Sequence, residues 1–171
     1  MPAGAERSFG LVWAGNSDYL YDRLRSPRLE PVRRLLDPPG WRPVILQAGD
    51  GRRDLDGISL PSHVSDLGEG LADFADTAAI IASLDLVITS DTAVAHLAGA
   101  MGQETWVMGW LQADWRWMPA PDGGPLWYPT ARMFRQHAPH QWVDVVDQLR
   151  QALAALPGHI PAPAPSTTIV R

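Results

Sequence analysis

The chain has 171 residues, a length that excludes two full domains. Its hydrophobic fraction of 46% excludes wholesale disorder. Its 19 acidic and 14 basic side chains give a formal net charge of −5, which argues against nucleic-acid or anionic-membrane partners because basic surfaces bind both. All 14 of these basic residues are Arg, and none is Lys. Cys is also absent, and this excludes disulfides, thiolate catalysis, zinc-thiolate sites and iron-sulfur clusters.

Both ends of the chain are predicted to be flexible tails around one folded unit, residues 9–156. Residues 1–8 lack periodicity, and residues 157–171 are rich in Pro and small side chains that cannot form a core. The start has no apolar segment of the kind a signal peptide needs, and the best apolar run, residues 78–89, is short and contains Asp85. We therefore expect no membrane span and a cytoplasmic location.

The first half of the folded unit shows two apolar runs that are typical of buried strands, residues 9–13 and 43–47. Between them, Ser26 and Pro27 predict an N-cap and the first position of a helix that continues through Leu36. Residues 48–70 are rich in Gly, Asp and Arg, with possible short strands at 58–60 and near Val64.

The second half alternates regularly between helical and strand patterns. Helices are predicted over residues 73–84, 92–101 and 142–156, and strands over 86–90, 105–108 and 131–135, with a Trp-rich loop over 109–130. This alternation predicts an α/β fold, a single Rossmann-like doubly wound parallel sheet with right-handed crossovers. Ligands of such folds bind at the carboxyl ends of the strands.

The sharpest local motif is Ser90–Ala100, in which a strand end meets the start of a helix made of small residues. Exposed amides of Thr92 and Ala93 would lie at the positive end of the helix dipole, where a phosphate binds without Lys. His96 would follow one turn later. The alternatives are that Asp91 only caps the helix and that His96 is merely packed or solvated.

The Trp-rich loop contains Asp114, Trp115 and Arg116, a combination of aromatic faces and polar partners that suits a sugar or base. The alternative is structural, because Trp in a long loop often covers a sheet edge. We expect roughly half of the six Trp from Trp106 to Trp142 to belong to the core.

No metal or cofactor is expected. Asp54-Leu55-Asp56 has an Asp-x-Asp form but follows a Gly-Arg-Arg segment instead of an apolar strand. His137 and His140 have no third ligand nearby in the sequence.

The run of residues 73–100 resembles the donor-site half of family 9 glycosyltransferases, the ADP-heptose:lipopolysaccharide heptosyltransferase group. It is similar above all to the version found behind tetratricopeptide repeats in bacterial proteins. The further stretches that fit that subgroup are residues 10–16, 22–23, 25–26, 114–117, 127–130 and 134–136. Together they extend the resemblance over roughly residues 9–156.

The resemblance implies the C-terminal half of a GT-B enzyme, which binds a nucleotide-diphosphate sugar. Thr92 and Ala93 would then offer amides to phosphate, Asp91 would contact sugar hydroxyls, and His96 would support the site.

After the first strand the family uses a hydroxyl pair and a Lys near the diphosphate, a region that here includes Asn16, Ser17, Arg23, Arg25 and Ser26. Arg25 or Arg23 is expected to replace the Lys, because a guanidinium binds phosphate oxygens with two parallel hydrogen bonds. Without the resemblance, both could be solvated charges paired with Asp22.

The resulting hypothesis is a donor half of a metal-independent glycosyl transfer site, active only with a second, N-terminal Rossmann domain or with a tetratricopeptide-repeat array as partner. The resemblance implies that the catalytic base is an acidic residue of that other domain, so no base is assigned here. The alternative is a non-catalytic nucleotide-sugar-binding or protein-interaction module with a degenerate site.

Overall fold

The computed structural model describes residues 7–112, 114–121 and 125–156. Its centre is one six-stranded sheet in the order β3-β2-β1-β4-β5-β6, in which all neighbouring strands pair in parallel. The strands are β1 (Arg7–Val12), β2 (Trp41–Ile45), β3 (Ser65–Asp66), β4 (Leu86–Ser90), β5 (Thr105–Gly109) and β6 (Ala131–Arg135). This order and the α/β alternation confirm the predicted Rossmann-like doubly wound sheet.

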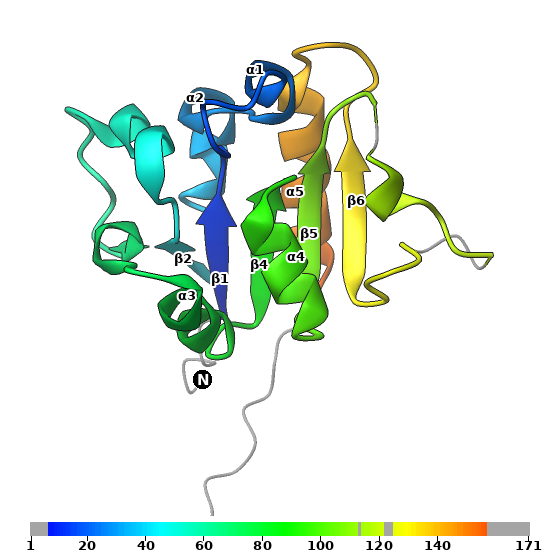
Figure 1. The fold of residues 1–171 in the computed structure, drawn as a ribbon. Helices are drawn as coiled ribbons and strands as arrows, with labels where there is room; N and C mark the ends of the chain where they lie inside the picture. The colour runs from blue at the N-terminus through cyan, green and yellow to red at the C-terminus, as the bar shows by residue number, and fades with distance from the viewer. Residues whose placement is uncertain (1–6, 113, 122–124, 157–171) are drawn as a thin grey trace, which may run out of the picture.

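Helices cover both faces of the sheet (Figure 1). One face carries α3 (Phe74–Ile81) and α4 (Ala93–Ala100), and the opposite face carries α2 (Leu29–Val32) and α5 (Trp142–Ala155). A short helix, α1 (Asp22–Arg25), lies above the carboxyl ends of the strands. Four 3-10 segments complete the described elements: η1 (Arg33–Leu35), η2 (Gly49–Leu55), η3 (Gly68–Gly70) and η4 (Trp115–Trp117).

Strand residues alternate between two apolar layers, as the period of a β-strand requires. Phe9 and Leu11 of β1 pack with α2 and α5, whereas Val12 packs with Ile81 of α3 and Ala98 of α4. Strand β4 is buried along its whole length. Burial on both faces explains why these strands read as continuous apolar runs in the sequence.

The strand order reverses between β1 and β4, which places a topological switch point at the middle of the sheet. The chain leaves β1 toward β2 on one side and leaves β4 toward β5 on the other. Val12 is in register with Thr89, so the loops after the two strands begin side by side. Doubly wound folds bind ligands in the crevice that such diverging loops leave open.

The helix predicted from Ser26 through Leu36 is confirmed only in part: its start is wrong, and the helical residues are α2 followed directly by η1. Arg28 has a positive φ of 65°, which breaks any helix that would start at Ser26. Pro31 adds a residue without an amide proton to α2. Ser26, the predicted N-cap, instead lies at the C-terminal end of α1.

Other boundaries differ by a few residues. Strand β1 begins at Arg7, inside the predicted N-terminal tail, and residues 58–60 are not a strand. The predicted tail over 157–171 lies outside the described residues. Within the described part of the chain, no helix has the length and apolar character needed to cross a membrane.

Candidate functional site

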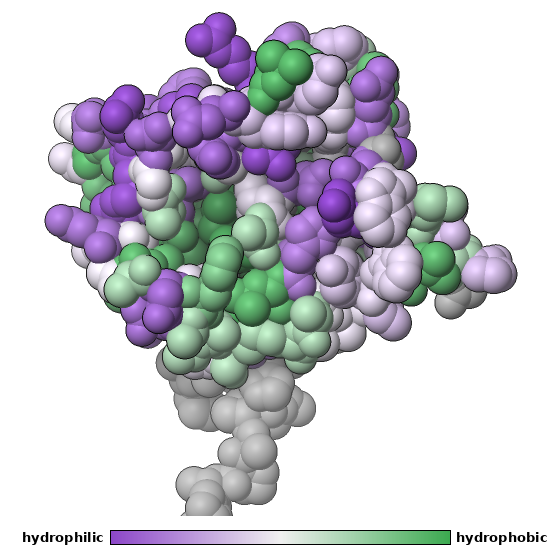
Figure 2. Space-filling model, in the orientation of Figure 1, coloured by the Kyte–Doolittle hydropathy of each residue, from purple (hydrophilic) through white to green (hydrophobic). Residues whose placement is uncertain are grey.

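Two cavities lie at the carboxyl ends of the strands, one on each side of the start of α4. The first has a volume of about 610 Å³ and the second about 590 Å³. Both are lined by Arg25, Thr92 and Ala93, so these three residues stand where the cavities meet. The face that carries α3 and α4 is hollowed between its polar upper edge and the apolar surface of these helices (Figure 2).

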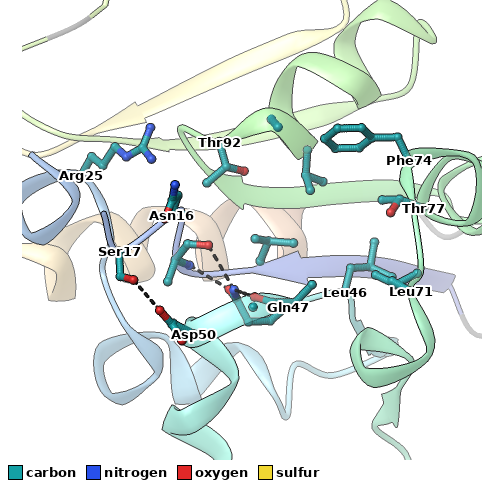
Figure 3. A pocket seen from close by; sticks show the side chains of 17 residues that line it. Asn16, Ser17, Arg25, Leu46, Gln47, Asp50, Leu71, Phe74, Thr77 and Thr92 are labelled. Atoms are coloured by element: carbon teal, nitrogen blue, oxygen red, sulfur yellow. Dashed lines mark hydrogen bonds between the residues drawn. The ribbon is translucent and has the colours of Figure 1, made fainter. Parts of the chain in front are cut away.

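The first cavity has an apolar side and a polar side (Figure 3). Leu46, Leu71 and the exposed ring of Phe74 form the apolar side. On the polar side, the Ser17 hydroxyl donates a 2.5 Å hydrogen bond to the Asp50 carboxylate. This hydrogen bond and the charge of Arg53 hold the pKa of Asp50 below its usual range.

Gln47 closes the floor of the first cavity and ties the loops after β1 and β2 together. Its side-chain oxygen accepts hydrogen bonds from the backbone amides of Trp13 and Ala14, both at 2.9 Å. Its amide group donates to the carbonyls of Ala14 and Ala48. A buried polar side chain with four such contacts continues the sheet's hydrogen bonding past the ends of both strands.

Arg25 is held in place by partners on three sides. Its Nε donates to Asp22 Oδ1 at 3.3 Å, its Nη1 donates to the Asp91 carbonyl at 3.0 Å, and its guanidinium lies 4.4 Å above the Tyr19 ring centre. A Cβ atom on Gly15 would come within 2.5 Å of Arg25 Nη2, so Gly15 makes room for the guanidinium.

Ser26 is buried and shares the Asp22 carboxylate with Arg25. Its hydroxyl accepts from the Gly15 amide at 3.0 Å and donates to Asp22 Oδ1 at 2.8 Å, which links the loop after β1 to α1. Arg23 is exposed on α1 and lines neither cavity. The alternative that Arg25 pairs with Asp22 is therefore correct, but the pair is largely buried, and its Arg25 member lines both cavities.

The start of α4 brings unpaired amides to the junction of the cavities. Thr92 is the N-cap residue, and the first amides of a helix have no carbonyl partner within the helix. Thr92 and Asp91 are each only 8% exposed. The alternative that Asp91 caps this helix is wrong, because no side-chain cap hydrogen bond forms and the Asp91 carboxylate turns toward Trp117.

In the second cavity, Asp91 and His96 belong to a cluster of aromatic and polar side chains. Trp117 Nε1 donates to Asp91 Oδ1 at 2.9 Å, and its ring stacks on His96 with centres 5.1 Å apart. His96 Nδ1 lies 3.2 Å from the Tyr128 hydroxyl, and Nε2 lies 3.8 Å from Asp91 Oδ1. Burial lowers the pKa of His96, although the nearby Asp91 charge opposes this shift.

The loop residues Asp114 and Arg116 line the second cavity and pair with each other. Trp115 does not line it. The Trp115 ring is exposed, with the Arg116 guanidinium 4.8 Å from its centre and the Trp127 ring 6.1 Å away. Of the six Trp in this part of the chain, three are buried, which are Trp106, Trp117 and Trp142.

Nine of the twelve predicted site residues line at least one of the two cavities. Asn16 and Ser17 line the first, and four line only the second, which are Asp91, His96, Asp114 and Arg116. Arg23, Ser26 and Trp115 line neither. The predicted site residues leave out Gln47, Asp50, Phe74 and Trp117. Phe74 and Trp117 lie in stretches that resemble the family, and Asp50 is a carboxylate shortly after the end of a strand, so Gln47 is the residue without a signal in the sequence.

The Asp-x-Asp segment discounted in the sequence is engaged elsewhere. The Asp54 carboxylate forms an ion pair with Arg28 and accepts from the Leu29 amide at 3.1 Å. Burial raises the pKa of Asp54, but the contacts with Arg28 and Leu29 outweigh it and leave the pKa below its usual value. In the described ranges, no three His, Asp or Glu side chains come together as metal ligands do.

Comparison with known proteins identifies the fold. No protein-family model matches the chain, and no curated protein matches its sequence. The structure is similar to E. coli ADP-heptose LPS heptosyltransferase II, with a TM-score of 0.52 and 17% identity over 88% of this chain and 49% of that chain. It is also similar to E. coli heptosyltransferase WaaC with ADP-2-deoxy-2-fluoro heptose, with a TM-score of 0.53 and 15% identity over 91% and 45%.

The chain thus spans about half the length of the solved structures it matches. At these identities the likeness shows the fold, a Rossmann-like unit of the kind found in GT-B heptosyltransferases. The resemblance inferred from the sequence is confirmed at that level.

Proposed function

We propose that the chain binds a nucleotide-diphosphate sugar and forms the donor half, the C-terminal half, of a glycosyltransferase site. The observation that carries this proposal is the pair of cavities that share Arg25, Thr92 and Ala93. A ligand that fills both cavities must have two bulky ends and a short middle part. A cation and the start of a helix at the junction favour a negative charge in that middle part.

The first cavity suits the nucleoside. Its apolar side, with the exposed ring of Phe74, offers a surface on which a base can stack. Asp50 and Ser17 lie opposite and can bind ribose hydroxyls, because a carboxylate held ionised is a strong acceptor.

The diphosphate would lie at the junction, and the sugar in the second cavity. Arg25 is fixed by Asp22 and by the Asp91 carbonyl, so little side-chain entropy is lost when it binds an anion. Asp91 and Asp114 line the second cavity and can accept hydrogen bonds from sugar hydroxyls. In a protein with a net charge of −5, this local cation makes the anion site.

This arrangement supplies one part of a glycosyl transfer site, the contacts to the leaving diphosphate. Arg25 and the α4 amides can stabilise the diphosphate as it leaves the sugar, which is the task a metal ion performs in other enzymes. The deprotonating base and the acceptor site would come from a second Rossmann-like unit, or the chain would act with a tetratricopeptide-repeat partner. The bacterial origin and the cytoplasmic location expected from the sequence stay predictions.

Calorimetric titration tests the binding proposal. ADP-, UDP- and GDP-sugars would each be titrated into the folded protein, with free sugars and nucleoside monophosphates as controls. We expect one nucleotide-diphosphate sugar to bind at least tenfold more tightly than either of its controls, because it alone reaches both cavities and the cation. A folded protein that binds none of the three would contradict the proposal and favour a protein-interaction module.

A further inference from the structure

Trp117 stands directly behind the second cavity and does not line it. It lies in η4 and is only 4% exposed, whereas Asp91 and His96 line the cavity. Its indole Nε1 donates to Asp91 Oδ1 at 2.9 Å. Among the described residues, no donor contacts the other Asp91 oxygen, Oδ2, and Asp91 lines the cavity.

The same indole also fixes His96. The two rings stack with an interplanar angle of 16°, and Tyr128 holds the far side of His96 through its hydroxyl. Gly99 allows the Tyr128 ring to approach α4, since a Cβ atom there would lie 2.6 Å from the ring. One buried side chain thus contacts both titratable groups, Asp91 and His96, that α4 and its preceding loop present to the second cavity.

We propose that Trp117 is a positioning residue, which holds the Asp91 carboxylate in the orientation that binds the sugar of the donor. This inference rests on the proposed function. The reason is geometric: a carboxylate rotates freely about its last bond unless a donor fixes one oxygen, and fixing Oδ1 directs Oδ2 toward the ligand. The indole also satisfies a carboxylate that is largely buried.

The variant Trp117→Phe keeps an aromatic ring against His96 and removes the N–H donor. Trp106→Phe is a matched control, because Trp106 is also buried and its Nε1 donates to the Glu104 carboxylate at 2.9 Å. Trp106 packs in the opposite layer of the sheet, with the cluster that contains α5.

The first measurement compares two ligands on each variant, a nucleotide-diphosphate sugar and the same nucleoside diphosphate without sugar, chosen from the ADP, UDP and GDP series. Trp117→Phe should weaken the nucleotide sugar about threefold to tenfold, the effect of one hydrogen bond, and leave the nucleoside diphosphate unchanged. Trp106→Phe should change neither. An equal loss for both ligands would show a merely structural role and overturn the proposal.

The second measurement needs no ligand, so it tests the Trp117–Asp91 contact separately from the proposed function. NMR titration of the His96 ring would follow its pKa, with Asp91, Asp114, Arg116 and the Tyr128 hydroxyl as the groups that face it. Without the indole donor, the Asp91 charge is uncompensated 3.8 Å from His96 Nε2, so Trp117→Phe should raise the pKa of His96.

A smaller ring also admits water, and this effect would raise the same pKa without involving Asp91. The comparison is therefore repeated with Asp91→Ala as the background, in which only the effect of water remains, so the proposal expects Trp117→Phe to raise the pKa of His96 less than it does with Asp91 present. Replacing Trp117 with benzothienylalanine, which keeps the indole shape without the N–H, should reproduce the rise. A pKa that does not change, or that rises equally with Asp91→Ala, would overturn the assignment.

Discussion

At the scale of single residues, the site depends on a cation held by its neighbours. Arg25 is anchored by Asp22, the Asp91 carbonyl and the Tyr19 ring, whereas Arg23 on the same short helix is exposed. Both were equivalent candidates in the sequence. The anchoring distinguishes them, because a guanidinium that is already fixed binds phosphate with a smaller entropic cost.

Arg25→Ala should therefore weaken nucleoside-diphosphate binding at least tenfold, through the loss of about 1.5–3 kcal/mol of charged hydrogen bonding. Arg23→Ala removes the same charge two residues away and serves as the control, with little change expected. Calorimetric titration of both variants with the nucleotide that the wild type prefers would measure the difference. Equal losses in the two variants would mean that only net charge matters.

His96 predicts how stability depends on pH. Burial lowers its pKa below the ordinary value of 6.5, so the unfolded chain binds the proton more readily than the folded protein. Its contribution to stability is thus complete above about pH 6.5 and is lost as the pH falls through the lowered pKa. Between neutral pH and about pH 5, His96→Gln should lose less unfolding free energy than the wild type in urea denaturation. Parallel curves would contradict this assignment.

At the scale of elements, α4 is the part on which most of the site depends. Its first residues border both cavities, His96 faces the second, and Gly99 on the same helix packs against Tyr128. A displacement of this helix would therefore disturb the phosphate contacts and the aromatic cluster together.

Gly99→Ala tests this packing. Ala is favoured over Gly in a helix by about 1 kcal/mol, but the new Cβ would meet the rigid Tyr128 ring at 2.6 Å, and overpacking costs about 1–3 kcal/mol. We expect a net loss of up to about 2 kcal/mol in unfolding free energy, measured by urea denaturation. With Tyr128→Ala as the background, the same substitution should become neutral or stabilising. A loss of unfolding free energy that persists with Tyr128→Ala would show that the strain does not come from the Tyr128 ring.

The elements also show which features a sequence can predict. Strands β1, β4 and β5 were predicted because burial on both faces makes them continuous apolar runs. The start of the helix over 26–36 was misplaced because Arg28 has a positive φ, and its side chain pairs with Asp54, 26 residues away, which a local pattern does not show. Gln47 and Trp117 were missed for a similar reason, since their partners lie 26 to 34 residues away in the chain.

At the scale of the whole molecule, the strand order places the loops after β1 and β4 on either side of one crevice. The loop after β1 brings Asn16 and Ser17, α1 brings Arg25, and the loop after β4 brings Asp91 and Thr92. The same architecture spans about half the length of the solved structures that the chain matches.

The proposed function requires that a single ligand spans both cavities through the junction at Arg25 and α4. Backbone NMR titration with a nucleoside diphosphate, and then with the matching nucleotide sugar, tests this most directly. The diphosphate should shift the amides of Gly49 and Ala93, in the first cavity and at the junction, and the sugar should add a shift at Gln112 in the second cavity. Shifts confined to one cavity with the complete nucleotide sugar, or none at Ala93, would contradict the claim.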